Sequence, residues 1–358
     1  MTVFRLWSMF ATLAAVPALF APTVVRSQET AEQKYIVSIE RIWDRAQHNA
    51  FTDLVAHGGH LYCAFREGTG HIPGLNGTIR VLRSADGHAW QSVALLTEQH
   101  IDLRDPKLSI APDGRLVVNM GASTYHGTKR LKVESRVAFS TSDGASFGPP
   151  QKVELPAEIT TGFDWLWRLT WHEGNAWGCV QQVTADRNGP RALQLVRSRD
   201  AIHYEKVATL AVDSPSETTL RFLPDGTLAA MIRCESKPQI GRIGLAKPPY
   251  TAWRFTDSNK RLGGPNFVQL PSGAWLAGSR EYEPSAHTAL WWLDPATGQF
   301  TDLVTFPTSG DNSYPGLVVD AKQNRVLMSY YSSHEGKAAI YLATLRLDAL
   351  EEAARNAK

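Results

Sequence analysis

Short apolar runs recur in pairs along the chain, and a small cluster of turn-forming residues joins the two runs of each pair. These clusters begin 47–61 residues apart, and they are Gly58-Gly59, PDG at 112–114, EGN at 173–175, PDG at 224–226, PSG at 271–273 and KQN at 322–324. Almost no stretch between residues 35 and 347 keeps the 3.6-residue apolar period of a helix over three turns. Short strands joined by regularly spaced turns predict an all-β protein.

A second repeat falls later in the same period. The segments RSADGHAW, TSDGASF and SRDAIHY each combine a hydroxyl residue, an aspartate and an aromatic residue, and their hydroxyl residues, Ser84, Thr141 and Ser198, lie 57 residues apart. The hydroxyl and aspartate side chains can bond nearby backbone groups and hold a turn. We therefore interpret these segments as structural turns between the third and fourth strands of a unit.

Together the two repeats predict six units of four strands, which is a six-bladed β-propeller. The last unit, 311–347, has room for only three strands. The spare strand KYIVSIERI at 34–42 can complete this unit and close the ring, which removes an unpaired sheet edge. The tail LDALEEAARNAK is typical of a short amphipathic helix. We expect a single domain over residues 28–358.

The first 27 residues have the pattern of a secretory signal peptide. Arg5 precedes a mostly apolar stretch at 6–21 that is too short and too interrupted by proline to span a membrane. Cleavage is expected after Ser27, and the alternative is an uncleaved anchor. The pattern predicts a secreted or periplasmic protein.

Composition and cysteine spacing narrow the function classes. Of 358 residues, 43% are hydrophobic and 20% are charged, and a net charge of +2 offers no basic surface for nucleic acid. Cys63, Cys179 and Cys234 each lie inside a strand-like run and lack zinc-site spacing. We therefore predict buried thiols, no disulfide, no metal and no cofactor, and the oligomeric state stays open.

In a propeller, residues at matching places of the repeats converge around the axis. On the first strands the repeats offer Asp53, Asp105, Asp164, Glu217, Asn266 and Tyr314. At the ends of the second strands they offer Arg66, Asn119, Gln181, Arg233, Arg280 and Tyr330. Three arginines at one level favour an anionic ligand, because a guanidinium pairs well with a carboxylate. The alternative is that each arginine pairs with an acid of a neighbouring blade.

The turn segments and the six-unit layout resemble the Asp-box propellers of the sialidase (neuraminidase) superfamily over residues 34–347. The segment SETTLRFLPDGTLAAMIR resembles the family segment in which a glutamate precedes an active-site arginine by one hairpin, here Glu217 and Arg233. The segment NSYPGLVV resembles the one that carries the tyrosine nucleophile, which falls on Tyr314. The segment LYCAFREG places Arg66 on a substrate-contacting arginine of the family.

Three positions depart from the family pattern. The family's Phe/Tyr-Arg-Ile-Pro motif opens the first blade, whereas NAFTDL has Ala50 in place of the first carboxylate-binding arginine. The family's acid/base aspartate lies a few residues beyond Arg66, where this chain has Glu67 or His71. SAHTALWW lacks the family's third arginine, and Arg280 on the preceding strand is the candidate replacement. The resemblance thus implies a matched nucleophile pair and a rebuilt carboxylate site.

The resemblance also implies a chemistry in which tyrosine replaces the usual carboxylate nucleophile. A carboxylate on the anomeric carbon of the sugar would repel an anionic nucleophile, whereas neutral Tyr314 can approach it and pass its proton to Glu217. Asp105 and His71 are the remaining acid/base candidates. Asp53 joins Arg66, Arg233 and Arg280 as a substrate-binding candidate, although Asp53 and Asp105 could equally be ion-pair partners of Arg66 and Arg104.

Three functions are compatible with these residues. The first is a secreted exo-glycosidase that releases a terminal acidic sugar, such as sialic acid, from glycans. The second is a non-catalytic propeller that binds glycans. The third is a lyase or hydrolase of another polysaccharide that uses His71 and Tyr314 as acid and base. In all three the partner is a glycan.

Overall fold

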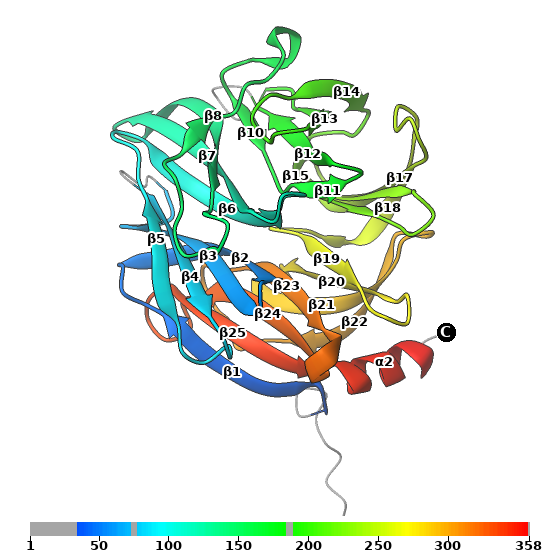
Figure 1. Ribbon diagram of the computed structural model, residues 1–358. Coiled ribbons are helices and arrows are strands. Elements are labelled where there is room, and N and C mark those ends of the chain that lie inside the picture. The colour runs from blue at the N-terminus through cyan, green and yellow to red at the C-terminus, as the bar shows by residue number, and fades with distance from the viewer. Residues whose placement is uncertain (1–33, 73–76, 184–188, 357–358) are drawn as a thin grey trace, which may run out of the picture.

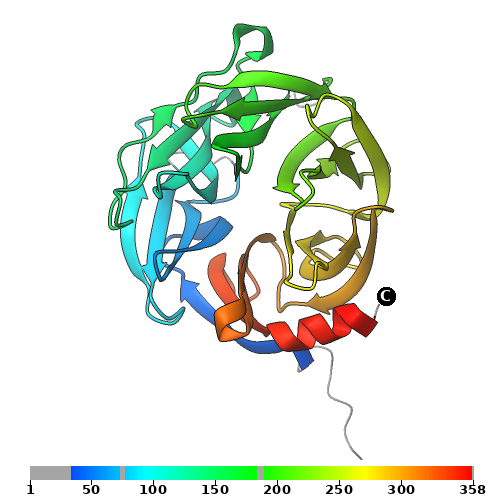
Figure 2. The ribbon, with the colours of Figure 1, turned by 45° about the vertical axis from the view of Figure 1, so that its right-hand side comes forward.

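The repeats of the sequence correspond to six antiparallel sheets arranged in a ring around a central axis (Figures 1 and 2). The computed structural model describes residues 34–72, 77–183 and 189–356. Each sheet is one blade, and in five of the six the chain passes from an inner strand at the axis to an outer strand at the rim. The predicted fold class, an all-β six-bladed propeller, is confirmed.

Blades 1 to 3 follow one another along the chain. In blade 3 the inner strand is split, because Trp167 and its neighbours interrupt the pairing with the second strand. The strands of these blades are β2 (His48–His57), β3 (His60–Gly68), β4 (Thr78–Ser84) and β5 (Gln91–Leu96); β6 (Asp102–Ile110), β7 (Leu116–His126), β8 (Lys129–Phe139) and β9 (Gln151–Lys152); and β10 (Asp164–Leu166), β11 (Thr170–His172), β12 (Asn175–Gln182), β13 (Ala192–Ser198) and β14 (Glu205–Leu210). A short 3-10 helix, η1 (Ala157–Ile159), precedes β10.

Blades 4 to 6 complete the ring. Their strands are β15 (Pro215–Phe222), β16 (Leu228–Cys234), β17 (Ile240–Ala246) and β18 (Trp253–Arg261); β19 (Asn266–Gln269), β20 (Trp275–Glu281), β21 (His287–Asp294) and β22 (Gln299–Thr305); and β23 (Asn312–Asp320), β24 (Arg325–Ser332), β25 (Ala339–Arg346) and β1 (Ile36–Trp43). The short 3-10 helix η2 (Ala321–Gln323) joins β23 to β24, and the helix α2 (Leu347–Asn356) follows β25.

The N-terminal strand closes the last blade, as the sequence predicted. Blade 6 has the order β1-β25-β24-β23, and β1 pairs antiparallel with β25 through partners such as Ile39 and Ala343. The two ends of the propeller domain therefore meet in one sheet, and β1 covers the edge that β25 would otherwise expose. The expected C-terminal helix is α2, which buries Leu350 against blade 6.

Both predicted sets of turns take their expected places. The six turn clusters join first to second strands, and Gly58, Gly114, Gly226 and Gly273 there have positive φ, which glycine adopts at low cost. The three hydroxyl–aspartate segments join third to fourth strands. In the first of these segments, Asp86 Oδ1 accepts hydrogen bonds from Ser84 Oγ and from two backbone N–H groups. The equivalent hydroxyl–aspartate bond recurs in the other two segments.

Apolar packing between neighbouring blades holds the ring together. Six clusters of buried apolar side chains each join two adjacent sheets, so that the core is continuous around the axis. The three cysteines, Cys63, Cys179 and Cys234, are buried and free, which confirms the prediction of unpaired thiols. Among the described residues, no helix combines the length and the apolar character needed to cross a bilayer. The predicted signal peptide, 1–27, lies outside the described residues.

Candidate active site

Bulges at one level of four inner strands build the mouth of the axis. The pairing of β2, β6, β15 and β23 with their second strands slips between Ala50 and Asp53, Arg104 and Lys107, Pro215 and Thr218, and Ser313 and Gly316. A bulge leaves residues unpaired and re-aims their side chains. The bulged residues include Phe51, Asp105, Glu217 and Tyr314, and all four line one pocket.

Three of these bulged residues have a left-handed backbone, which is uncommon for residues other than glycine. The φ angles are 63° at Phe51, 47° at Asp105 and 55° at Tyr314, and Ser313 beside Tyr314 has 89°. Such strain persists only where the surrounding structure enforces it, and it is concentrated at functional sites. The coincidence of strain, bulges and a pocket makes this mouth the candidate active site.

The pocket has a volume of about 200 Å³ and is formed by blades 1 to 4 and blade 6. It combines apolar walls with a set of charged groups, as small-molecule sites do. The apolar walls are Phe51, Ile72, Val133, Trp165 and Val183, the arginines are Arg104, Arg130, Arg191 and Arg233, and the acids are Asp105, Glu217 and Glu235. Such a concentration of guanidinium groups suits a ligand with a negative charge.

Tyr314, Glu217 and Arg233 form one hydrogen-bonded unit in this pocket. The phenol Oη of Tyr314 donates to Glu217 Oε1 over 2.5 Å. Arg233 Nη1 donates to Glu217 Oε2 over 3.0 Å and lies 3.4 Å from Tyr314 Oη. The backbone N–H of Gly264 donates to the same Glu217 oxygen over 2.6 Å. Three residues from blades 4 and 6 that the sequence placed together are therefore in direct contact.

The surroundings of this unit set its protonation. Burial alone would raise the pKa of Glu217, but the charge of Arg233 and the hydrogen bonds from Tyr314 and Gly264 outweigh it and hold this pKa below its ordinary value. Burial and the adjacent Glu217 carboxylate raise the pKa of Tyr314 well above its ordinary value. The resting site thus pairs a neutral phenol with an ionised carboxylate, which can accept the phenol's proton.

Gly264 allows this close approach. Its φ is 63°, and a Cβ added to it would lie 2.5 Å from the Tyr314 ring. A side chain at this position would therefore displace the tyrosine or its glutamate partner. The glycine is required by contact with the site as well as by its backbone conformation.

Arg280 supports Tyr314 from the side of blade 5. Its guanidinium lies 5.5 Å from the centre of the Tyr314 ring and donates to the carbonyl of Asn312 and to Tyr331 Oη. Arg280 does not belong to the pocket lining that the described residues form. Arg280, a predicted substrate-binding residue, therefore lies beside the candidate nucleophile Tyr314. The hydrogen bonds of its guanidinium go to protein groups.

Asp105 lines the pocket from blade 2. Its side chain is almost fully buried, and burial raises its pKa although Arg104 Nε lies 3.6 Å from its carboxylate. A raised pKa makes a carboxyl group more suited to hold and donate a proton. The structure therefore keeps Asp105 as a candidate acid, in contact with the arginine that the sequence offered as an alternative ion-pair partner.

His71 lines the pocket from the loop after β3. Its Nδ1 lies 2.7 Å from Asp311 Oδ2, and its ring packs edge-on against Phe51 at 5.0 Å. The same Asp311 oxygen lies 2.8 Å from His48 Nε2. These three side chains form a group among the described residues with the spacing to hold a metal ion. Their hydrogen bonds to one carboxylate already account for the arrangement.

Besides Arg280, two further predicted substrate-binding residues, Arg66 and Asp53, lie outside the pocket lining formed by the described residues. Arg66 is fully buried, and its Nε and Nη2 each lie 2.8 Å from Asp102 Oδ1. Its Nη1 donates to the carbonyl of Gly70, next to His71. Arg66 therefore supports the loop that carries His71, and its role in the site is indirect.

Asp53 does not occupy the position that the comparison of the repeats predicted, which was the blade 1 counterpart of Asp105. It follows the bulge of β2, so its structural counterpart in β6 is Lys107, whereas Phe51 matches Asp105. Its Oδ2 lies 2.5 Å from Arg168 Nη1 and accepts the backbone N–H of Leu108. The ion-pair alternative thus fits Asp53, with Arg168 in place of the expected Arg66.

The sequence interpretation missed several pocket residues. The sequence offers Arg104 only as a partner of Asp105, whereas in the structure it lines the pocket and donates to the carbonyl of His71. Arg130 and Arg191 come from blade 2 and from the segment before β13, and no repeat position marks them. Asp311 is the missed residue that the sequence could have indicated, because it lies only three residues before the predicted nucleophile Tyr314.

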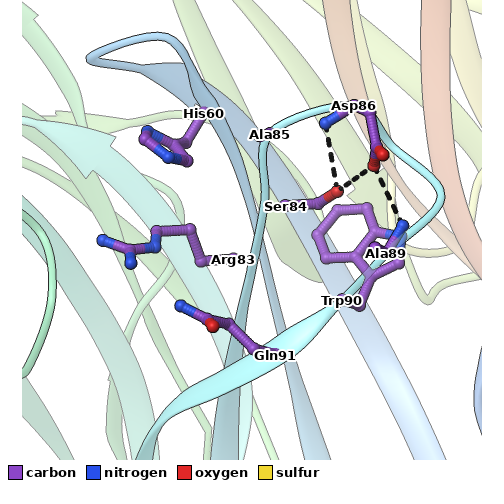
Figure 3. A pocket seen from close by; sticks show the side chains of 8 residues that line it. All are labelled: His60, Arg83, Ser84, Ala85, Asp86, Ala89, Trp90 and Gln91. Atoms are coloured by element: carbon purple, nitrogen blue, oxygen red, sulfur yellow. Dashed lines mark hydrogen bonds between the residues drawn. The ribbon is translucent and has the colours of Figure 1, made fainter.

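A second, larger hollow lies at the rim of blade 1 (Figure 3). Its volume is about 360 Å³, and Figure 3 shows that its wall includes the turn of Ser84 and Asp86. The polar atoms of that turn bond to one another and to nearby backbone N–H groups. His60, Arg83 and Gln91 border the hollow without an acid–base pair or a strained backbone at these residues. We therefore place the candidate site at the mouth of the axis.

Comparison of the sequence with known proteins gives no assignment. No protein-family model matches the chain, and no curated protein sequence matches it. Any likeness to known proteins must therefore come from the structure.

Comparison of the structure gives many similar solved structures. A protein of unknown function from Dyadobacter fermentans superimposes with a TM-score of 0.76 at 18% identity, over 87% of this chain and 98% of that chain. The Trypanosoma rangeli sialidase in complex with 2,3-difluorosialic acid, described as a covalent intermediate, gives 0.70 at 15% identity, over 89% of this chain and 60% of that chain. The Penicillium chrysogenum α-L-arabinanase in complex with arabinobiose superimposes with a TM-score of 0.65 at 13% identity, over 87% of this chain and 99% of that chain. At these identities the comparison shows the fold alone, and the chain has a divergent, sialidase-like six-bladed β-propeller fold.

Proposed function

We propose that this protein is an exo-glycosidase that releases a terminal acidic sugar from a glycan, with Tyr314 as nucleophile and Glu217 as its base. The observation that carries the proposal is the 2.5 Å hydrogen bond from Tyr314 to Glu217 in a pocket lined by arginines. A neutral phenol that is hydrogen-bonded to a carboxylate base can attack an anomeric carbon next to a carboxylate.

The proposed reaction has two steps. In the first, Tyr314 Oη bonds to the anomeric carbon while its proton passes to Glu217 and the glycosidic C–O bond breaks. The leaving oxygen takes a proton from an acid, for which His71 and Asp105 are the candidates in the pocket. In the second step water attacks the anomeric carbon, loses its proton to that same acid/base group, and Tyr314 leaves as its proton returns from Glu217.

Charge and size support an acidic terminal sugar. Arg233 and Arg104 present guanidinium groups to a pocket whose volume, about 200 Å³, lies below the usual range for drug-sized ligands. That size favours one terminal unit over a longer glycan segment. Sialic acid is the first substrate to test, because the similar T. rangeli structure is a sialidase with a bound difluorosialic acid. We further propose that residues 1–27 export the chain, which would bring it to extracellular glycans.

The His71–Tyr314 pair supports a second candidate, a lyase of acidic polysaccharide. The two rings pack on the same Phe51, with ring centres 5.0 and 5.2 Å from it. A base and an acid on either side of one sugar could remove a proton next to a carboxylate and protonate the leaving oxygen. Such a reaction gives an unsaturated product, whereas hydrolysis gives a saturated sugar.

The test is a panel of aryl glycosides and native glycans with acidic and neutral terminal units, with the products followed by NMR. We expect release of a saturated acidic sugar, first as the anomer of the substrate, because two displacements retain configuration. An unsaturated product would support the lyase. Tight binding without turnover would support a non-catalytic glycan-binding propeller, and either result would overturn the glycosidase proposal.

A further inference from the structure

Asp311 lies at the centre of a network that the nucleophile chemistry does not use. Its Oδ2 is 2.7 Å from His71 Nδ1 and 2.8 Å from His48 Nε2, and its Oδ1 accepts the Tyr331 hydroxyl over 2.7 Å. Arg280 Nη2 lies 3.5 Å from Oδ1. One carboxylate thus binds two imidazoles and connects them, through Tyr331 and Arg280, to the surroundings of the nucleophile.

This network fixes which nitrogen of His71 can exchange a proton. Burial alone would raise the pKa of Asp311, but the hydrogen bonds from His48 and His71 outweigh it and hold this pKa well below its ordinary value. An ionised carboxylate only accepts hydrogen bonds, so the His71 nitrogen that faces it must carry hydrogen. With Nδ1 protonated, Nε2 is the nitrogen that gains and loses a proton, and His71 lines the pocket.

The backbone around His71 is held as well. Arg66 Nη1 donates to the carbonyl of Gly70, and Arg104 Nη1 donates to the carbonyl of His71, each over 2.9 Å. Phe51 packs edge-on against the imidazole ring. Two arginines therefore hold the backbone at His71, while an aromatic ring and a carboxylate hold its half-exposed side chain.

We propose that Asp311 is a positioning residue that holds His71 as the general acid/base of the reaction, in place of the aspartate that the resemblance implies. The proposal rests on the proposed glycosidase function and chooses His71 over Asp105 for the acid. His48 shares the carboxylate and keeps Asp311 in place when the His71 proton leaves. The charged and titratable groups that face His71 are His48 from β2, Arg104 and Asp105 from β6, and Asp311 before β23.

Leaving-group dependence tests the proposal, because an acid is needed for a poor leaving group and hardly for a good one. Asp311→Asn and His71→Gln should lose about 10²–10⁴-fold in kcat/KM on an alkyl glycoside of the acidic sugar, the usual contribution of an acid/base. Both should lose less than about 10-fold in kcat/KM on the nitrophenyl glycoside, because kcat/KM reports the first step and leaves out the attack of water that the same group assists. The basic side of the kcat/KM–pH profile on the alkyl glycoside should move in Asp311→Asn.

Glu40→Gln is the matched control, because Glu40 accepts from His88 in an exposed pair of the same kind outside the pocket. It should leave both substrates and the pH profile unchanged. His71→Gln also keeps the test valid if Asp311→Asn folds poorly, since His71 is half-exposed and its replacement leaves Asp311 bound to His48.

Tyr314→Phe separates this inference from the proposed function. If Tyr314→Phe keeps its activity, the proposed function fails. If Tyr314→Phe is inactive while Asp311→Asn loses equally on both leaving groups, or loses nothing, the inference alone fails. A readout without turnover is ¹⁵N NMR of the neutral His71 ring, where we expect hydrogen on Nδ1 in the parent and a mixture of tautomers in Asp311→Asn. Hydrogen on Nε2 in the parent would overturn the inference.

Discussion

At the scale of single residues, charged side chains at matching positions of the sequence repeats differ in how deeply they are buried. Arg66 and Arg233 occupy the same place in blades 1 and 4, at the end of a second strand. Arg66 is fully buried against Asp102, whereas Arg233 lines the pocket beside Glu217. Both arginines pair with protein acids, and only the packing decides whether the guanidinium also reaches the pocket.

Because of this difference, we expect the same substitution to lower stability at Arg66 and to weaken sugar binding at Arg233. Arg66→Met should lower the free energy of unfolding by about 3 kcal/mol, because it leaves the Asp102 charge buried with only Arg104 nearby. Arg233→Met should weaken binding of an acidic sugar by about 10–100-fold, the value of a charge-assisted hydrogen bond. Denaturant unfolding and calorimetric titration of both variants check this. Equal loss of acidic and neutral sugar binding in Arg233→Met would mean that this arginine has a structural role alone.

The protonation of Glu217 predicts a shift of the acidic limb of activity. As the proposed base, Glu217 must be ionised, and its pKa is held below its ordinary value, so the parent should lose activity only as the pH falls through that lowered pKa. Arg233→Gln removes the charge that opposes burial, so the pKa should rise and the acidic limb should move to higher pH. The measurement is kcat/KM against pH for both proteins. An acidic limb that does not move would show that Arg233 does not set the protonation of Glu217.

At the scale of elements, strands and turns were predictable and bulges were not. Turn residues such as Gly114 and alternating apolar residues are local signals, so the six hairpins and the closing strand could be placed from the sequence. A bulge depends on how a strand pairs with its neighbour, and no local pattern marks it. Asp53 was therefore aligned with Asp105, although the bulge of β2 places Phe51 there.

The closing strand predicts the effect of a truncation. A chain that begins after β1 should melt at a lower temperature, because blade 6 loses its outer strand and β25 becomes an exposed edge. A chain that begins at residue 34 is the control, since it keeps β1 and removes only residues that precede it. Thermal unfolding followed by circular dichroism gives the comparison. Cooperative melting of the shorter chain at the temperature of the control would contradict the closure of the ring by β1.

At the scale of the whole molecule, the ring is held by apolar contact between blades, while the site is built where the blades meet. The fold and the Tyr314–Glu217–Arg233 unit were predictable, because each follows from a repeat or a quoted segment. The arginines of the pocket wall, such as Arg130, and the partner of His71 were not. They come from strand ends and loops whose meeting depends on how the blades pack.

Because the apolar core is continuous around the ring, we expect the three buried cysteines to become reactive only when the whole ring unfolds. Cys63 and Cys179 are fully buried, and burial raises the pKa of both thiols, so neither should react with a thiol reagent in the folded protein. Cys234 is buried as well, and burial raises its pKa to about 11. Labelling should therefore require unfolding and should follow the loss of circular dichroism across a denaturant series. Rapid labelling of a thiol in the native protein would show that blades open separately.

The central claim is that Tyr314 is the nucleophile of a glycosidase, and the kcat of Tyr314→Phe tests it most directly. The substitution removes one hydroxyl and keeps the ring that packs against Phe51 and Trp167. On the nitrophenyl glycoside of the acidic sugar that the parent cleaves, we expect kcat to fall at least about 10³-fold, with an unchanged melting temperature as evidence of an intact fold. A Tyr314→Phe variant that retains most of the parent's kcat would contradict the account.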